Sequence, residues 1–150
     1  MPTILIAPAD PAEAGGLIRE LDAYQASLYP AESNHLLPLD ALRHPNVTFL
    51  VARVDDQVAG CGAFVRYVEY AEIKRMFVSP EFRGLKLGRR ILEEIEWRIR
   101  AAGLALARLE TGVSQPEALR LYESAGYLRC GPFGEYREDH LSVFMEKHLR

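Results

Sequence analysis

The sequence contains little that would mark a secreted, metal-binding or membrane-spanning protein. Its two cysteines, Cys61 and Cys130, are far apart and lack a partner motif, so we expect reduced thiols and no disulfide framework. No spacing of His, Cys and carboxylates typical of a metal site is present, so no metal is expected. No apolar run reaches the ~20 residues that a membrane-spanning helix needs, and the N-terminus lacks the basic region of a signal peptide. These absences predict a cytoplasmic protein without a membrane partner.

The charges of the chain are nearly balanced. The 18 Lys and Arg residues and 21 Asp and Glu residues leave a net charge of −3, which argues against a nucleic-acid partner. The length of 150 residues is enough to bury one core, so we expect a single domain over residues 1–150. The positive charge is concentrated locally, between Lys74 and Arg90.

Hydrophobic periodicity predicts a mixture of strands and helices. Strands are expected at 3–7, 47–54, 58–67, 68–78, 104–111, 127–130 and 141–147, and helices at 11–29, 87–102 and 116–125. Period two places one face of the 68–78 strand at Val68, Tyr70, Glu72, Lys74, Met76 and Val78. Leu36, Leu37, Leu39 and Leu42 predict a short helix between Pro30 and Pro45, where His35 and His44 have no ligand spacing. Ser114 to Glu117 predicts a capping box.

The chain is organised around residues 72–99. A predicted strand leads into Arg83-Gly84-Leu85-Lys86-Leu87-Gly88, and this loop leads directly into an amphipathic helix. N–H groups and the dipole at a helix N-terminus favour an anion, and Arg83, Lys86 and Arg89 add positive charge. The loop therefore predicts a phosphate site, with a solvated basic turn as the alternative. A Walker-type loop is excluded because no Gly-Lys-Ser/Thr ends the run.

Two motifs together resemble the GCN5-related N-acetyltransferase (GNAT) superfamily, over roughly residues 47–147. The glycine loop resembles the family's Gln/Arg-x-x-Gly-x-Gly/Ala, with Lys86 at the middle glycine. Gln115 to Tyr127 resembles Asn-x-x-Ala-x-x-Leu-Tyr-x-x-x-Gly-Phe/Tyr, with glutamine replacing asparagine. We expect Lys86 to adopt an ordinary helical conformation, because a positive φ would strain a lysine.

The resemblance implies an α/β fold that binds acyl-CoA. Its mixed, mostly antiparallel sheet of six or seven strands would be flanked by about four helices and splay open between the fourth and fifth strands. The backbones of Met76, Phe77 and Val78 would pair with the pantetheine arm, in the manner of strand addition. The pyrophosphate would bind at Arg83, Gly84, Leu85, Lys86, Leu87, Gly88 and Arg89, and Gln115 and Tyr122 would complete the acetyl-CoA site.

The resemblance also implies an acetyl-CoA-dependent N-acetyltransferase, in which the primary amine of a small molecule attacks the thioester directly. Tyr122 matches the family's acid position, and a phenol of pKa about 10 can protonate a thiolate of pKa about 8.5. Glu72 is the expected base, since several family members keep a carboxylate there. The alternatives are a core role for Tyr122, an ion pair of Glu72 with Lys74 or Arg75, a base acting through water, and no dedicated base at all.

The acceptor and the assembly are less determined. Glu110, Glu135, Tyr136, Glu138 and Asp139 are expected to form an acidic, aromatic rim that attracts a cationic amine, or else a solvated loop. A non-catalytic acyl-CoA-binding or regulatory module is the alternative function, and it would also bind CoA. The sequence leaves the oligomeric state open, a homodimer included.

Overall fold

The computed structural model describes residues 1–34 and 37–150, so the expectations for His35 and Leu36 lie outside the described residues. Its centre is a seven-stranded sheet in the order β1-β2-β3-β4-β5-β7-β6. The strands are β1 (Ile4–Pro8), β2 (Val47–Val54), β3 (Gln57–Arg66), β4 (Ala71–Val78), β5 (Leu106–Gly112), β6 (Leu128–Cys130) and β7 (Ser142–His148). All neighbouring pairs are antiparallel except β4 and β5, which confirms the predicted mixed, mostly antiparallel sheet.

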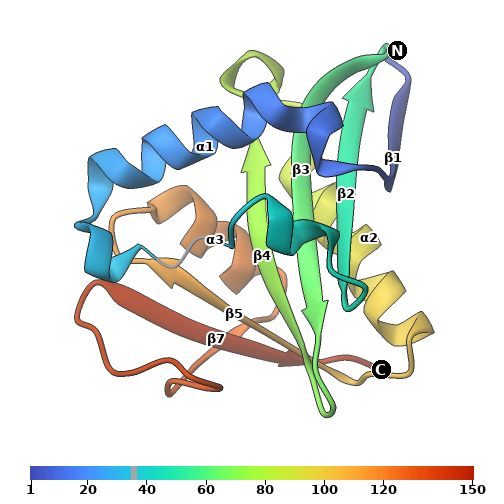
Figure 1. Cartoon of the computed structure of the whole chain (residues 1–150). Helices are drawn as coiled ribbons and strands as arrows, with labels where there is room; N and C mark the ends of the chain where they lie inside the picture. The colour runs from blue at the N-terminus through green and yellow to red at the C-terminus, as the bar shows by residue number, and fades with distance from the viewer. Residues whose placement is uncertain (35–36) are drawn as a thin grey trace.

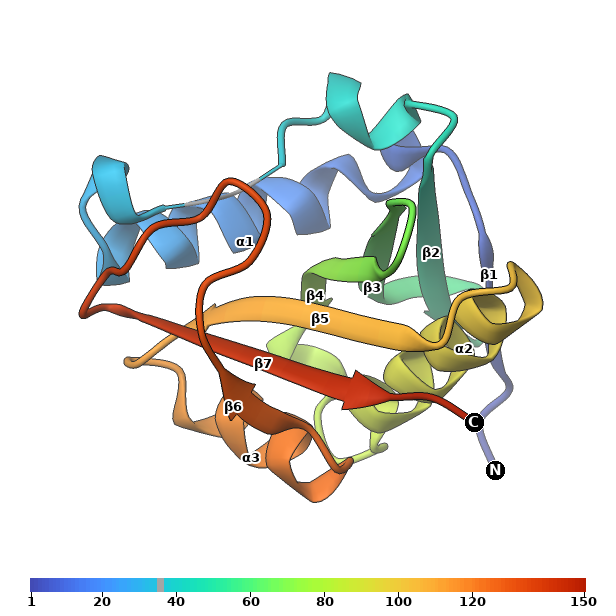
Figure 2. The same cartoon turned by 90° about the horizontal axis from the view of Figure 1, so that it is seen from below.

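Three α-helices cover the two faces of the sheet in the described part of the chain. They are α1 (Gly15–Leu28), α2 (Leu87–Ala101) and α3 (Pro116–Ser124). Figures 1 and 2 show α1 on one face and α2 and α3 on the other. The first turn of the expected 11–29 helix is a 3₁₀ turn, Pro11–Ala14, whose N-cap Asp10 forms a capping box with Glu13. In the described residues between Pro30 and Pro45, two 3₁₀ turns, Ala31–Ser33 and Asp40–Arg43, are found where a short helix is expected.

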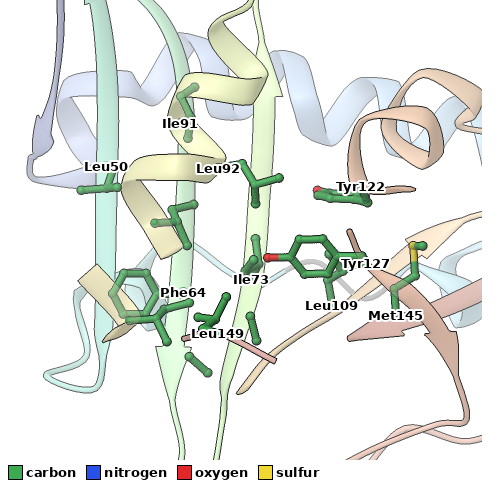
Figure 3. Packing of buried hydrophobic residues seen from close by; sticks show 14 of the residues in the cluster. Leu50, Phe64, Ile73, Ile91, Leu92, Leu109, Tyr122, Tyr127, Met145 and Leu149 are labelled. Atoms are coloured by element: carbon green, nitrogen blue, oxygen red, sulfur yellow. The ribbon is translucent and has the colours of Figure 1, made fainter. Parts of the chain in front are cut away.

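The main core lies between α2 and the sheet (Figure 3). Ile91, Leu92, Ile95 and Ile99 of α2 are all at most 1% exposed, and they pack on the same cluster as Phe64 and Ile73. Their spacing near four residues forms the predicted apolar stripe of an amphipathic helix. A second buried cluster lies under α1, where Leu17 and Ile18 join Phe49, Val51 and Cys61. The two cores hold the middle of the sheet from both faces.

The sheet splays between its fourth and fifth strands, as predicted. The parallel pairing of β4 with β5 consists of Ala71 with Ala107, Glu72 with Arg108 and Ile73 with Leu109. From there the two strands diverge, and Figure 1 shows the widening gap between them. The end of β4 thus keeps an edge that is free of β5.

A bulge in β4 changes which side chains share a face. Cys61 pairs with Phe77 and Ala63 pairs with Lys74, so Arg75 and Met76 together oppose Gly62. Arg75 has a φ of 60°, and its extra position reverses the alternation. Phe77 joins the core under α1, whereas Met76 and Val78 pack toward α2. The expectation of one common face for Glu72, Lys74, Met76 and Val78 is therefore wrong.

The start of β4 also differs from the prediction. The strand begins at Ala71, and Val68 is 94% exposed in the turn after β3. This turn closes with the Tyr67 N–H donating to the Tyr70 carbonyl at 2.9 Å. Val68 has a high β-propensity, but it lies in the hairpin turn between β3 and β4 and not in a strand.

Gly62 is predicted to be essential to the packing of α2 on the bulge. A Cβ at this position would lie 2.8 Å from Ile91 Cγ2, 2.8 Å from Met76 Sδ and 3.0 Å from Ile95 Cδ1. Gly62→Ala should therefore lower the free energy of unfolding by about 1–3 kcal/mol through overpacking, measured by urea denaturation. Gly131→Ala is the matched control, because a Cβ at Gly131 meets nothing within 4 Å. Equal stability of the two variants would contradict this account.

Candidate active site

A groove runs between the end of β4, the glycine loop and α3. Most of the predicted cofactor residues line it, namely Met76, Phe77, Val78, Arg83, Gly84, Lys86, Leu87, Gly88, Gln115 and Tyr122. Two predicted residues do not line it. Leu85 packs with the small cluster of Val54 and Ala59, and Arg89 Nη1 donates to Ser124 Oγ at 3.1 Å. Sequence reasoning missed Tyr24 of α1, which reaches the groove from the opposite face of the sheet and carries no motif signal.

The glycine loop reaches its shape through two residues with positive φ. Gly84 has a φ of 93°, and Lys86 has a φ of 58° and a ψ of 33°. The expectation of an ordinary helical conformation for Lys86 is therefore wrong: the lysine adopts the left-handed conformation that a glycine takes readily. Lys86 is the N-cap of α2 and gives no side-chain cap, so the N–H groups of the first turn are available to an anion.

A second, inner cavity lies deeper in the splay. It is lined by Glu72 to Met76 of β4, Glu110 to Gly112 of β5, and Leu21, Gln25 and Tyr29 from the α1 segment. Met76, Gln115, Ala118 and Tyr122 line both this cavity and the groove. The two spaces therefore meet at these four residues. The inner cavity has a volume of only about 80 Å³, so it has room for the reacting end of a molecule and not for a whole one.

Tyr122 lies buried at this junction, projecting from α3 (Figure 3). Its ring meets the Tyr127 ring edge to face, with centroids 5.8 Å apart. Burial raises the pKa of the Tyr122 phenol above its ordinary 10.0, and the nearby Glu110 raises it further. The phenol is thus a proton donor at neutral pH.

Gln115 and Tyr29 tie α1 to the loop after β5. The Tyr29 hydroxyl accepts from the Ser114 N–H at 3.1 Å and donates to Gln115 Oε1 at 3.2 Å. The Gly112 N–H donates to the same Gln115 oxygen at 3.2 Å. The predicted capping box is wrong, because α3 begins after Gln115 without a side-chain cap. The amide oxygen is used by this bridge, and the amide NH₂ remains to act as a donor.

Glu72 is buried on the wall of the inner cavity, only 5% exposed. Tyr136 donates its hydroxyl proton to Glu72 Oε2 at 2.5 Å, and Lys74 Nζ lies 3.5 Å from the same oxygen. Of the two ion pairs weighed for Glu72, the structure contains the one with Lys74. Arg75 instead pairs with Asp22 and donates to the Leu37 carbonyl.

The predicted acidic rim is divided between two cavities. Glu135, Tyr136, Glu138 and Asp139 line an outer cavity, whereas Glu110 lines the inner one. Glu72 and Lys74 line both cavities and stand between them. The Asp139 carboxylate accepts hydrogen bonds from Ser33 Oγ at 2.7 Å and from the Leu141 N–H at 2.9 Å.

In residues 1–34 and 37–150, no cluster of three or more His, Cys, Asp or Glu side chains is arranged to hold a metal ion. None of the helices in these ranges has the length and hydropathy required to cross a membrane.

This geometry suits an acyl-CoA-dependent transferase, because the helix N-terminus can bind a pyrophosphate and the free edge of β4 can pair with a pantetheine arm. Residues 45–129 match the acetyltransferase (GNAT) domain, and the chain belongs to this family. It is therefore an acetyl-CoA-dependent N-acetyltransferase, as the two sequence motifs predicted.

Similar proteins span the full length of the chain. An IAA acetyltransferase of Azospirillum brasilense is 52% identical over 153 residues, covering 99% of this chain and 100% of that protein. The crystal structure of a protein from Klebsiella pneumoniae subsp. pneumoniae, provisionally named an acyl-CoA N-acyltransferase, is 36% identical with a TM-score of 0.82, covering 100% of this chain and 99% of that one. The fold alone is shared with Salmonella typhimurium YncA, solved with acetyl-CoA, at 19% identity and a TM-score of 0.74, covering 98% and 94% of the two chains.

Gly112 is predicted to set the position of the Tyr29 bridge. A Cβ at Gly112 would lie 1.7 Å from the Tyr29 hydroxyl oxygen and 2.1 Å from ring carbon Cζ. Gly112→Ala should therefore expel the Tyr29 ring and cost more stability than Tyr29→Phe, which loses only hydrogen bonds worth about 1 kcal/mol each. Thermal unfolding of the two single variants and the double variant measures this. Additive losses in the double variant would show that the two positions do not interact.

Lys86 offers a test of the left-handed residue in the loop. Lys86→Gly and Lys86→Ala both remove the charge, but only glycine removes the steric cost of the positive φ. Lys86→Gly should therefore be the more stable of the two by about 1 kcal/mol in urea denaturation. Both variants should weaken acetyl-CoA binding by the same few-fold factor in calorimetry, because the exposed lysine contributes only its charge. A stability order with alanine above glycine would contradict the strained conformation.

Proposed function

We propose that the protein transfers the acetyl group to the primary amine of a small molecule whose amino group enters the inner cavity, by direct attack on the thioester. The observation that carries this proposal is the junction, because Met76 and Tyr122 line both the cofactor groove and the inner cavity. A thioester lying at the junction would face the inner cavity. No covalent enzyme intermediate is needed, since the two substrates meet directly.

In this proposal the chain holds acetyl-CoA at three places. The N–H groups at the start of α2, with Arg83 and Lys86, bind the pyrophosphate. The backbones of Met76, Phe77 and Val78 pair with the amides of the pantetheine arm, because this end of β4 lies beyond the last β5 pair at Ile73. The Gln115 NH₂ group donates to the arm, since its oxygen already accepts from Gly112 and Tyr29.

Glu72 and Tyr122 take the two proton-transfer roles. Glu72 removes a proton from the acceptor amine, which attacks only when its nitrogen lone pair is free. Tyr122 donates a hydrogen bond or proton to the departing thiolate, because burial keeps its phenol protonated. Both side chains line the inner cavity, Glu72 from β4 and Tyr122 from α3.

Three further predictions concern the whole protein. We expect a cytoplasmic location, which fractionation tests, and a single domain over 1–150, which limited proteolysis tests. A homodimer also stays a prediction, and analytical ultracentrifugation tests it.

Thiol release from acetyl-CoA with a panel of acceptors tests the proposal. The panel contains aliphatic diamines, arylalkylamines, amino-acid amides and amino sugars, together with IAA, for which the Azospirillum relative is named. With the fastest amine, Tyr122→Phe and Glu72→Gln should each lower kcat roughly 10²-fold, the size of one acid–base contribution. Calorimetric affinity for acetyl-CoA should change less than about twofold in both variants. Unchanged kcat in either variant removes that residue from the mechanism.

A further inference from the structure

We propose that Tyr136, held by Lys74, is a positioning residue for the acetyl transfer, and that it acts by fixing the Glu72 carboxylate so that Oε1 faces the acceptor amine. This inference rests on the proposed role of Glu72 as the base. It adds a residue from the loop between β6 and β7 to a site otherwise built on β4, β5 and α3. Neither motif of the sequence contains Tyr136 or Lys74.

Both polar contacts of the Glu72 carboxylate with the described residues are made to the same oxygen, Oε2. Tyr136 donates to Oε2 at 2.5 Å, and Lys74 Nζ approaches the same oxygen to 3.5 Å. Because both groups act on Oε2, the carboxylate plane is fixed while Oε1 is left without a donor from the described part of the chain, next to the two cavities that Glu72 lines. Glu72 lines that cavity and is almost fully buried, so its orientation is set by these contacts more than by water.

Lys74 determines the direction in which the Tyr136 proton points. Its ammonium group donates to the Tyr136 oxygen at 3.0 Å, and an ammonium group can only donate. The Tyr136 oxygen therefore accepts from Lys74 and directs its own proton to Glu72. Burial raises the pKa of Tyr136, and the Glu72 charge raises it further, so the hydroxyl proton stays in place.

Aromatic packing holds the Tyr136 ring. The ring lies edge to face against Phe133, with centroids 5.2 Å apart, and against Phe144 of β7, at 5.4 Å. The Tyr136 N–H also donates to the Phe133 carbonyl at 3.1 Å. A rigid aromatic support of this kind limits the freedom of the hydroxyl group and, through it, of Glu72.

A second cluster with the same three residue types shows what a purely structural arrangement looks like. Tyr127 donates to Glu96 Oε2 at 2.8 Å, and Lys147 Nζ donates to both carboxylate oxygens at 3.1 and 3.2 Å. There the lysine binds the carboxylate directly and both oxygens are used. In the Glu72 cluster the lysine donates to the tyrosine and also pairs with the carboxylate, but it approaches only Oε2, the oxygen that Tyr136 already contacts. A general base requires an oxygen such as Oε1, without a donor and next to a cavity, to accept a proton from the substrate.

The test is a double-mutant cycle on kcat, measured with the fastest amine of the panel. Tyr136→Phe alone should lower kcat roughly tenfold and leave KM for acetyl-CoA unchanged. In the Glu72→Gln background, Tyr136→Phe should have no further effect, because it acts through Glu72. Tyr127→Phe is the matched control: it removes the other buried tyrosine–glutamate hydrogen bond and should lower Tm without lowering kcat.

A proton NMR measurement needs no acceptor. The wild type should show a low-field hydroxyl proton that is lost in both Tyr136→Phe and Glu72→Gln and kept in Tyr127→Phe. An additive cycle, or wild-type kcat in Tyr136→Phe together with a slow Glu72→Gln enzyme, overturns this inference and leaves the proposed function standing. Wild-type kcat in Glu72→Gln overturns the proposed base, and the inference with it. If no amine reacts, the proposed function fails, and the absence of the low-field proton then overturns the contact itself.

Discussion

The bulge at Arg75 is the constraint on which the rest of the site depends. One extra residue in β4 bends the strand and reverses its alternation just after its last pair with β5. A non-glycine residue at a φ of 60° costs of order 1–3 kcal/mol, so the surrounding structure must compensate. The compensation is visible: the Arg75 guanidinium is buried against Asp22 of α1 and the Leu37 carbonyl. Strain in one strand is thus balanced by contacts that also bring α1 over the site.

The bulge divides β4 into two parts that line different spaces. Before it, Glu72 and Lys74 line the inner and outer cavities, and after it Met76, Phe77 and Val78 line the cofactor groove. One strand therefore carries the proposed base and the proposed cofactor edge in sequence, with the junction between them. The bridge from Tyr29 to Gln115 spans the open end of the splay, so the strands diverge without leaving the gap unsupported.

Sequence reasoning succeeded where a short motif specifies backbone geometry. The glycine loop and the Gln115 to Tyr127 motif predicted the family, because each depends on local spacing, and the family resemblance in turn implied the splay and most of the residues that line the groove. It failed at Lys86 for an energetic reason: the strain argued against a positive φ, yet the lysine adopts that conformation at the start of α2. It also failed on the faces of β4, because strict period two cannot anticipate a bulge whose compensating partners, Asp22 and Leu37, are distant in sequence.

Tyr136 shows the limit of sequence reasoning more sharply. It was assigned to an acidic rim because acidic residues surround it in the sequence, but its hydroxyl contacts Glu72, 64 residues away. The residue types in such a cluster do not distinguish a catalytic carboxylate from a structural one, since Glu96, Tyr127 and Lys147 form a cluster of the same three types. What separates the two is whether the lysine approaches one carboxylate oxygen or both, and whether the carboxylate lines a cavity. Burying a carboxylate is costly, and a structural cluster offsets that cost most fully by using both oxygens. A buried carboxylate with both donors on one oxygen gives up part of that stabilisation, and a role in chemistry is a physical reason for it to do so.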